Sequence, residues 1–117
     1  MTRATTAAAK EIRQRRAERK AAMEAAGWQF HEELRLDGVL PLVEGRLFRV
    51  EGQRGWFKFR EARTTPDGLA IEVDCFGPYR PDGTLNMAQV GAGAFRCFGS
   101  HRVTKVARRV ESQPERG

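Results

Sequence analysis

Hydrophobic and polar residues alternate in two short runs that flank the segment Gly52-Gln53-Arg54-Gly55. The runs cover residues 45–51 and 56–63, and strict alternation of this kind predicts half-buried strands. Glycines on both sides of a short polar segment are typical of a tight turn, so we expect a β-hairpin. Glycine and proline recur about every ten residues through the following chain, which is typical of a small β barrel or sandwich. Three more strands are expected at residues 69–76, 94–98 and 103–108.

The segment Gly99-Ser100-His101-Arg102 lies between the last two expected strands and has about the length of one 3₁₀ turn. Five short antiparallel strands with such a turn before the last strand are the layout of an SH3-like barrel. The sequence therefore predicts a mainly β domain, a small five-stranded SH3-like barrel over residues 28–110 with a long polar loop at 77–93. An OB-like barrel fits the same pattern as an alternative.

One α-helix is predicted before the barrel, in residues 1–27, where strong helix formers dominate and Gly27 provides a C-terminal stop. Its apolar stripe is thin, so most of the helix is expected to be solvated. Only the last turn, near Met23, is expected to dock on the barrel together with Trp28 and Phe30. Residues 111–117 are expected to form a disordered tail.

The register of the hairpin predicts which side chains form the core. A two-residue turn sets Phe48 opposite Phe59 and Val50 opposite Phe57, and opposite residues share a face. A slip by one residue would set apolar against charged side chains, so this face is expected to be buried. The same alternation is expected to place Ile71, Val73, Cys75, Phe95 and Cys97 in the core.

The other face of the hairpin carries cations beside an indole ring. Arg49 is expected opposite Lys58, where like charges are unfavourable unless an anion lies nearby. A large aromatic side chain, Trp56, next to such a pair is suited to binding a backbone phosphate and stacking a base. This outer face is expected to hold Leu47, Arg49, Glu51, Trp56, Lys58 and Arg60.

Ordinary cross-strand ion pairs offer an alternative explanation of this face. Glu72 and Asp74 alternate outward on the third expected strand and could neutralise Lys58 and Arg60. In that case Trp56 would cover the end of the barrel or pack under the helix, and the face would have no ligand.

The net charge of +6 and a sequence pI of about 10.1 permit attraction to polyanions such as nucleic acid. Residues 1–27 contribute seven basic and three acidic side chains. A basic helix of this kind could contact phosphates of DNA or RNA without reading sequence, or it could simply keep a small protein soluble. The candidate phosphate-binding residues in this helix are Arg13, Arg15, Arg16, Arg19 and Lys20.

No residue pattern indicates catalysis or metal binding. Ser100 beside His101 is not a nucleophile and base without further geometry. Cys75 and Cys97 are expected to be buried thiols, with a disulfide as the alternative, and they lack the closely spaced partners of a zinc site. We therefore expect no enzyme, no metal, no cofactor and no small-molecule substrate.

No apolar run is long enough to span a membrane, and the basic, alanine-rich N-terminus lacks the apolar segment of a secretory signal. A cytoplasmic protein without a membrane partner is therefore expected.

Three stretches, GRLFRVEGQRGWFKF, TPDG and FRCFGSHRVTKVARR, together resemble a family of small basic proteins from actinobacteria and their bacteriophages. The function of that family is unknown, and its members are thought to form SH3-like barrels. The resemblance covers residues 45–109 and implies a phage-encoded protein that acts in a bacterial cell, with no catalytic residues to transfer. The loop at 77–93 and the charged helix depart from the family pattern.

These observations predict a non-catalytic accessory protein that binds nucleic acid, DNA or RNA, through its basic helix and barrel face. The alternative is a protein-interaction module that binds a host or phage protein, such as a virion or assembly component, and has no nucleic-acid role. Further arginines that could add to a nucleic-acid interface are Arg54, Arg96, Arg102, Arg108 and Arg109.

Overall fold

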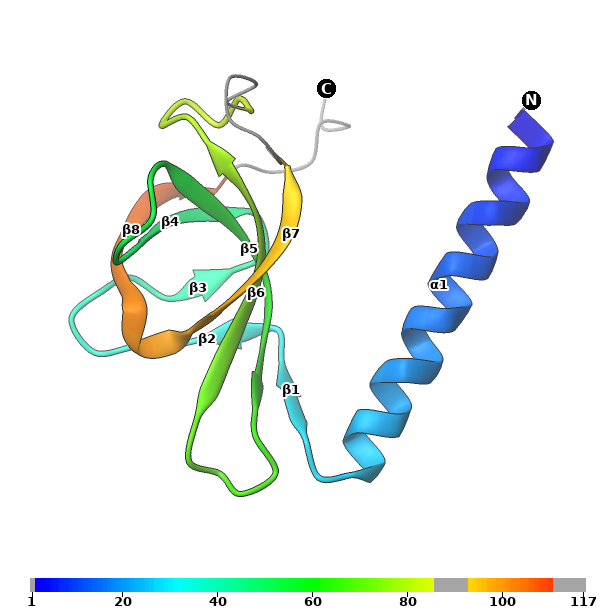
Figure 1. Ribbon diagram of the computed structural model, residues 1–117. Coiled ribbons are helices and arrows are strands. Elements are labelled where there is room, and N and C mark those ends of the chain that lie inside the picture. Colours follow the sequence, from blue (N-terminus) through cyan, green and yellow to red (C-terminus); the bar gives the residue numbers. More distant parts are fainter. Residues whose placement is uncertain (1, 86–92, 111–117) are drawn as a thin grey trace.

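The computed structural model describes residues 2–85 and 93–110, which fold as a mainly β structure with one N-terminal helix (Figure 1). The mainly β class, the N-terminal helix and the 3₁₀ turn at Ser100–Arg102 (η1) confirm the sequence predictions. The elements are α1 (Thr2–Ala25), β1 (Gln29–His31), β2 (Glu33–Leu34), β3 (Leu42–Val43), β4 (Arg46–Val50), β5 (Trp56–Thr64), β6 (Ile71–Tyr79), β7 (Ala94–Gly99) and β8 (Val103–Val110).

Five strands form one antiparallel path in the order β7-β6-β5-β4-β8. The short strand β1 pairs with the C-terminal half of β5, and β2 pairs with β3 in a separate two-stranded sheet. Within the described residues, β7 and β8 do not pair with each other, so the sheet is not closed into a barrel. The structure therefore has an open antiparallel sheet and three additional short strands, where the sequence predicted five strands in a closed barrel.

The core lies on one face of β4, β5 and β6 and is centred on three phenylalanines. Phe48, Phe57 and Phe59 are fully buried, and the ring of Phe57 contacts Phe98 with centroids 5.0 Å apart. Full burial of each such side chain stabilises the fold by roughly 2–3 kcal/mol. The inward face predicted for the hairpin is thus confirmed. The other buried core residues are Leu34, Leu42, Val50, Ala62, Val73, Cys75 and Val106.

The hairpin register differs from the predicted one by two residues. Leu47, not Arg49, lies opposite Lys58, because the connection between β4 and β5 spans residues 51–55 instead of two residues. An even shift preserves the inward and outward faces, which explains why the core prediction survives the wrong register. Arg49 instead lies opposite Lys105 of β8, so two cations still face each other across a strand pair. Leu47, expected in solvent, is only 2% exposed.

Two residues expected in the core lie on the outer face of β7. Phe95 is 55% exposed and Cys97 is also exposed. The reason is the pairing with β6, which sets Phe98 opposite buried Val73 and thereby turns Phe95 and Cys97 to the other side. The inward parity predicted for this strand was therefore wrong by one residue.

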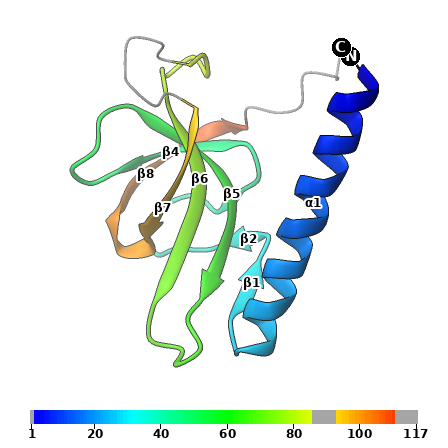
Figure 2. The ribbon, with the colours of Figure 1, turned by 45° about the vertical axis from the view of Figure 1, so that its right-hand side comes forward.

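Helix α1 contacts the sheet near its C-terminal end, through Lys20, whereas the predicted contact was at Met23 in the last turn. Lys20 Nζ lies 3.1 Å from a Glu61 carboxylate oxygen on β5 and 4.8 Å from the centre of the Phe30 ring. Gly27 adopts a left-handed φ of 108° where the helix ends, and the guanidinium of Arg63 lies 5.4 Å from the Trp28 ring. The N-terminal half of α1 lies apart from the sheet in two views (Figures 1 and 2).

The segment predicted as a loop at 77–93 begins later than expected, because β6 continues to Tyr79. Residues 86–92 of this segment and the predicted tail at 111–117 lie outside the described residues. No helix in the described part of the chain has an apolar stretch that would let it cross a membrane.

Candidate nucleic-acid interface

Strand pairing brings four aromatic side chains onto one outer face of the sheet. Trp56 lies opposite Tyr79, and Lys58 lies opposite Phe76, which in turn lies opposite Phe95. Because opposite residues share a face, these side chains line the same side of β5, β6 and β7. We call this surface the aromatic–cationic face and define it as Arg49, Trp56, Lys58, Phe76, Tyr79 and Phe95.

The two cations of this face are held by aromatic rings. The guanidinium of Arg49 lies 5.5 Å from the centre of the Trp56 ring, and Lys58 Nζ lies 4.6 Å from the centre of the Tyr79 ring. Contacts of this kind contribute about 0.5–1 kcal/mol each near a surface. Among the described residues, neither cation has a carboxylate oxygen within 4.0 Å. Their charges are therefore positioned by the rings but not neutralised.

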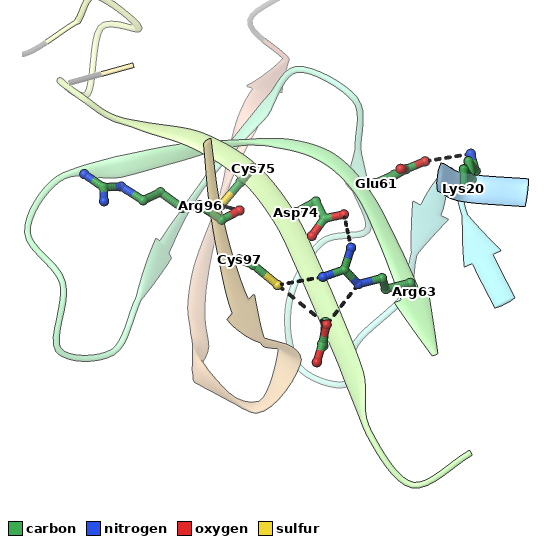
Figure 3. Close-up of polar contacts among 8 residues, drawn as sticks. Lys20, Glu61, Arg63, Asp74, Cys75, Arg96 and Cys97 are labelled. Atoms are coloured by element: carbon green, nitrogen blue, oxygen red, sulfur yellow. Dashed lines mark hydrogen bonds and ion pairs between the residues drawn. The ribbon is translucent and has the colours of Figure 1, made fainter. Parts of the chain in front are cut away.

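The acidic residues that could have neutralised this face are occupied elsewhere (Figure 3). Arg63 Nε donates to Glu72 at 2.9 Å, and Arg63 Nη1 donates to Asp74 at 3.1 Å. A register shift in β5 between Phe59 and Glu61 places Arg63 opposite Glu72. The predicted cross-strand pairs of Glu72 and Asp74 with Lys58 and Arg60 are therefore wrong, and the alternative explanation of the face loses its basis.

Arg63, Glu72 and Asp74 form a structural ion-pair network beside the aromatic–cationic face. Asp74 is only 3% exposed, and this burial raises the pKa of its carboxyl although Arg63 pulls it down. Burial works against the charge of Arg63, but its hydrogen bond to Glu72 and its attraction to Asp74 leave its pKa raised overall. A buried carboxylate of this kind destabilises the fold when its cationic partner is removed.

Both cysteines are free thiols, and each forms a hydrogen bond with a neighbouring residue. Cys75 is buried as predicted, and its thiol donates to the Arg96 carbonyl oxygen at 3.7 Å. Cys97 accepts from Arg63 Nη2 at 3.4 Å (Figure 3), and burial together with nearby Asp74 raises its thiol pKa to about 11. Low thiolate content at neutral pH makes Cys97 a poor nucleophile.

The candidate phosphate-binding residues of the helix are not all exposed and unpaired among the described residues. Arg13, Arg16 and Arg19 are exposed, whereas Arg15 forms a 2.9 Å ion pair with Glu11 on the helix surface. Lys20 forms an ion pair with Glu61 on β5. The helix and the strand ends that carry Arg49 and Trp56 lie apart (Figures 1 and 2), so the structure does not combine the two predicted groups into one site.

The remaining predicted cations differ in their surroundings. Arg60 is exposed and lies 4.0 Å from a Glu44 oxygen, which leaves it weakly paired. Arg102 Nη2 donates to the Glu51 carbonyl at 2.7 Å, so this side chain holds two segments of the sheet together. Arg54 and Arg108 are exposed and Arg96 is partly buried, while the side chain of Arg109 lies outside the described residues.

Arg49, Trp56 and Lys58 were predicted from the sequence, whereas the three other rings of the face were not. Tyr79 fell in a segment expected to be a loop, and Phe95 was expected in the core. Phe76 alternates with Asp74 along β6, which was a usable signal for an outward position.

Comparisons of the chain with protein-family models, with curated proteins and with solved structures found no match. The resemblance of residues 45–109 to small basic proteins of actinobacteria and their phages therefore stays a prediction.

Proposed function

We propose that this chain is a non-catalytic accessory protein that binds nucleic acid through the aromatic–cationic face, with the exposed arginines of α1 as a second phosphate contact. One observation carries this proposal: Arg49 and Lys58 are fixed over aromatic rings while the nearby acids Glu72 and Asp74 are bound by Arg63. A cation that is oriented but not neutralised is suited to a phosphate oxygen, and the net charge of +6 favours approach of a polyanion.

The proposal includes the type of fold and its cellular setting. The strand order β7-β6-β5-β4-β8, with η1 before the last strand, supports an SH3-like arrangement that is left open between β7 and β8. A phage-encoded protein in the bacterial cytoplasm follows from the sequence resemblance alone.

Salt dependence tests the proposal. Affinity of the full chain for fluorescently labelled mixed-sequence DNA and RNA is measured by anisotropy at two salt concentrations. Binding should weaken steeply with salt because phosphate contacts release counterions. For Lys58→Gln, the slope of log K against log salt should fall by about 0.7–0.9, the value of one phosphate contact.

Arg35→Gln is the matched control because it also removes one positive charge. Arg35 is exposed and paired with Glu33 at 3.0 Å; it directly follows β2, which belongs to the two-stranded sheet and not to the strands that carry the aromatic–cationic face. For Arg35→Gln, the slope of log K against log salt should stay at the wild-type value. No binding at low salt, or equal losses for the two variants, would overturn the proposal and favour the protein-interaction module.

A further inference from the structure

We propose that the aromatic–cationic face binds single-stranded nucleic acid, with bases stacked on Phe95 and the rings beside it. This inference rests on the proposed function and adds the class of ligand. A single strand offers its base faces to protein side chains, whereas a duplex hides them in its own stack.

The exposed ring of Phe95 carries the inference. It is 55% exposed although it belongs to a regular strand, and it packs against Phe76 with ring centroids 5.8 Å apart at an interplanar angle of 72°. A single exposed apolar side chain would be ordinary. Here the ring continues a set of aromatic side chains that strand pairing sets side by side, as is typical of stacking platforms.

The dimensions of the face suit a short segment of single strand. Its rings lie on β5, β6 and β7, and neighbouring strands are about 4.8 Å apart, so the platform is about 10 Å wide. A platform of this width is expected to hold about two bases, since sheet surfaces with aromatic side chains typically stack two or three. The described part of this face is formed by strands alone, without a helix or arm that could enter a duplex groove.

Cations continue from the rings across the sheet. Lys58 lies opposite Leu47 on β4, and Arg49 on the same strand lies opposite the exposed Lys105 on β8. Lys58, Arg49 and Lys105 thus lead from the aromatic platform toward the β8 edge. Such a row can follow the phosphates of a strand whose bases rest on the rings.

The test compares a labelled DNA single strand of about ten nucleotides with the duplex of the same sequence, at low salt, by anisotropy. Wild-type protein should bind the single strand more tightly than the duplex. Phe95→Leu keeps the apolar bulk but loses the aromatic ring, and should weaken single-strand binding about tenfold. Phe95→Tyr should retain wild-type affinity because it keeps the ring, and circular dichroism would confirm that both variants fold.

Leu69→Ala is the control for loss of exposed apolar surface. Leu69 is 85% exposed in the turn between β5 and β6, outside the face, and its replacement should leave affinity unchanged. If the duplex binds as tightly as the single strand, or Phe95→Leu behaves as wild type, the inference is wrong. If Lys58→Gln still reduces the salt slope in that case, the proposed function survives, whereas absence of all binding would overturn both.

Discussion

Replacement of Arg63 by methionine should strongly destabilise the fold. Arg63 is the only described residue that forms ion pairs with Glu72 and Asp74, at 2.9 and 3.1 Å, and the Asp74 side chain is almost completely buried. Methionine has a similar length and can pack against Trp28, but it leaves the buried carboxylate of Asp74 without a cation. Removing one partner of a buried ion pair is costly for this reason.

The expected loss is about 3 kcal/mol, at the lower end of the 3–5 kcal/mol typical of a broken buried pair. The lower end applies because Arg63 is 19% exposed and Asp74 can take up a proton. In a domain of this size, that loss corresponds to a decrease in Tm of roughly 12 °C or more.

The loss should depend on pH. The pKa of Asp74 is raised in the folded protein above its ordinary value of 3.8, so the folded state favours the protonated carboxyl more than the unfolded state does. Its contribution to stability is therefore largest at low pH and declines as pH rises through the folded pKa. Without Arg63 that pKa rises further, so the deficit of Arg63→Met should be smaller at pH 5 than at pH 7.

Urea denaturation of wild type, Arg63→Met, Asp74→Asn and the double variant at both pH values provides the measurement. In the Asp74→Asn background, Arg63→Met should cost much less, because no buried charge remains to be compensated. Equal costs in the two backgrounds, or a deficit independent of pH, would refute the reasoning.

Three further predictions follow from individual contacts. Gly77→Ala should cost about 1–3 kcal/mol in urea denaturation, because a Cβ there would lie 2.6 Å from Phe57 Cδ2; an unchanged midpoint would contradict this. Iodoacetamide at pH 8 should alkylate Cys97 about tenfold more slowly than a thiol with a pKa of 9, because its pKa of about 11 lowers the thiolate fraction about a hundredfold and the greater nucleophilicity of that thiolate offsets part of the loss; equal rates would contradict the assignment. Lys20→Ala should cost under about 1 kcal/mol because its pair with Glu61 is partly exposed, and a larger loss would show tighter docking of α1.

The predictable part of the fold was the part where apolar and polar residues alternate strictly. Phe48, Phe57 and Phe59 point inward under either the predicted or the observed register, because the two differ by an even number of residues. In strand β7 the alternation of Phe95, Arg96 and Cys97 was misleading, because Phe98 breaks it and only the pairing of Phe98 with Val73 fixes the parity. The strands β1, β2 and β3 are two or three residues long, too short to give a periodic signal.

The same distinction applies to the candidate site. Arg49, Trp56 and Lys58 could be predicted because they belong to one hairpin, where local spacing determines neighbours. Tyr79 joins them only because β6 shifts register against β5 near its end. The ion pair between Arg63 and Glu72 likewise depends on a register shift in β5, which no local sequence pattern predicts.

The proposed function places the indole of Trp56 at a nucleic-acid interface. Trp28→Phe leaves Trp56 as the only tryptophan and keeps an aromatic ring beside Arg63. Titration of this variant with a single-stranded oligonucleotide should quench the Trp56 fluorescence to saturation at low salt, and added salt should reverse the quenching. Unchanged Trp56 emission while anisotropy reports a bound oligonucleotide would place the interface elsewhere and contradict the claim.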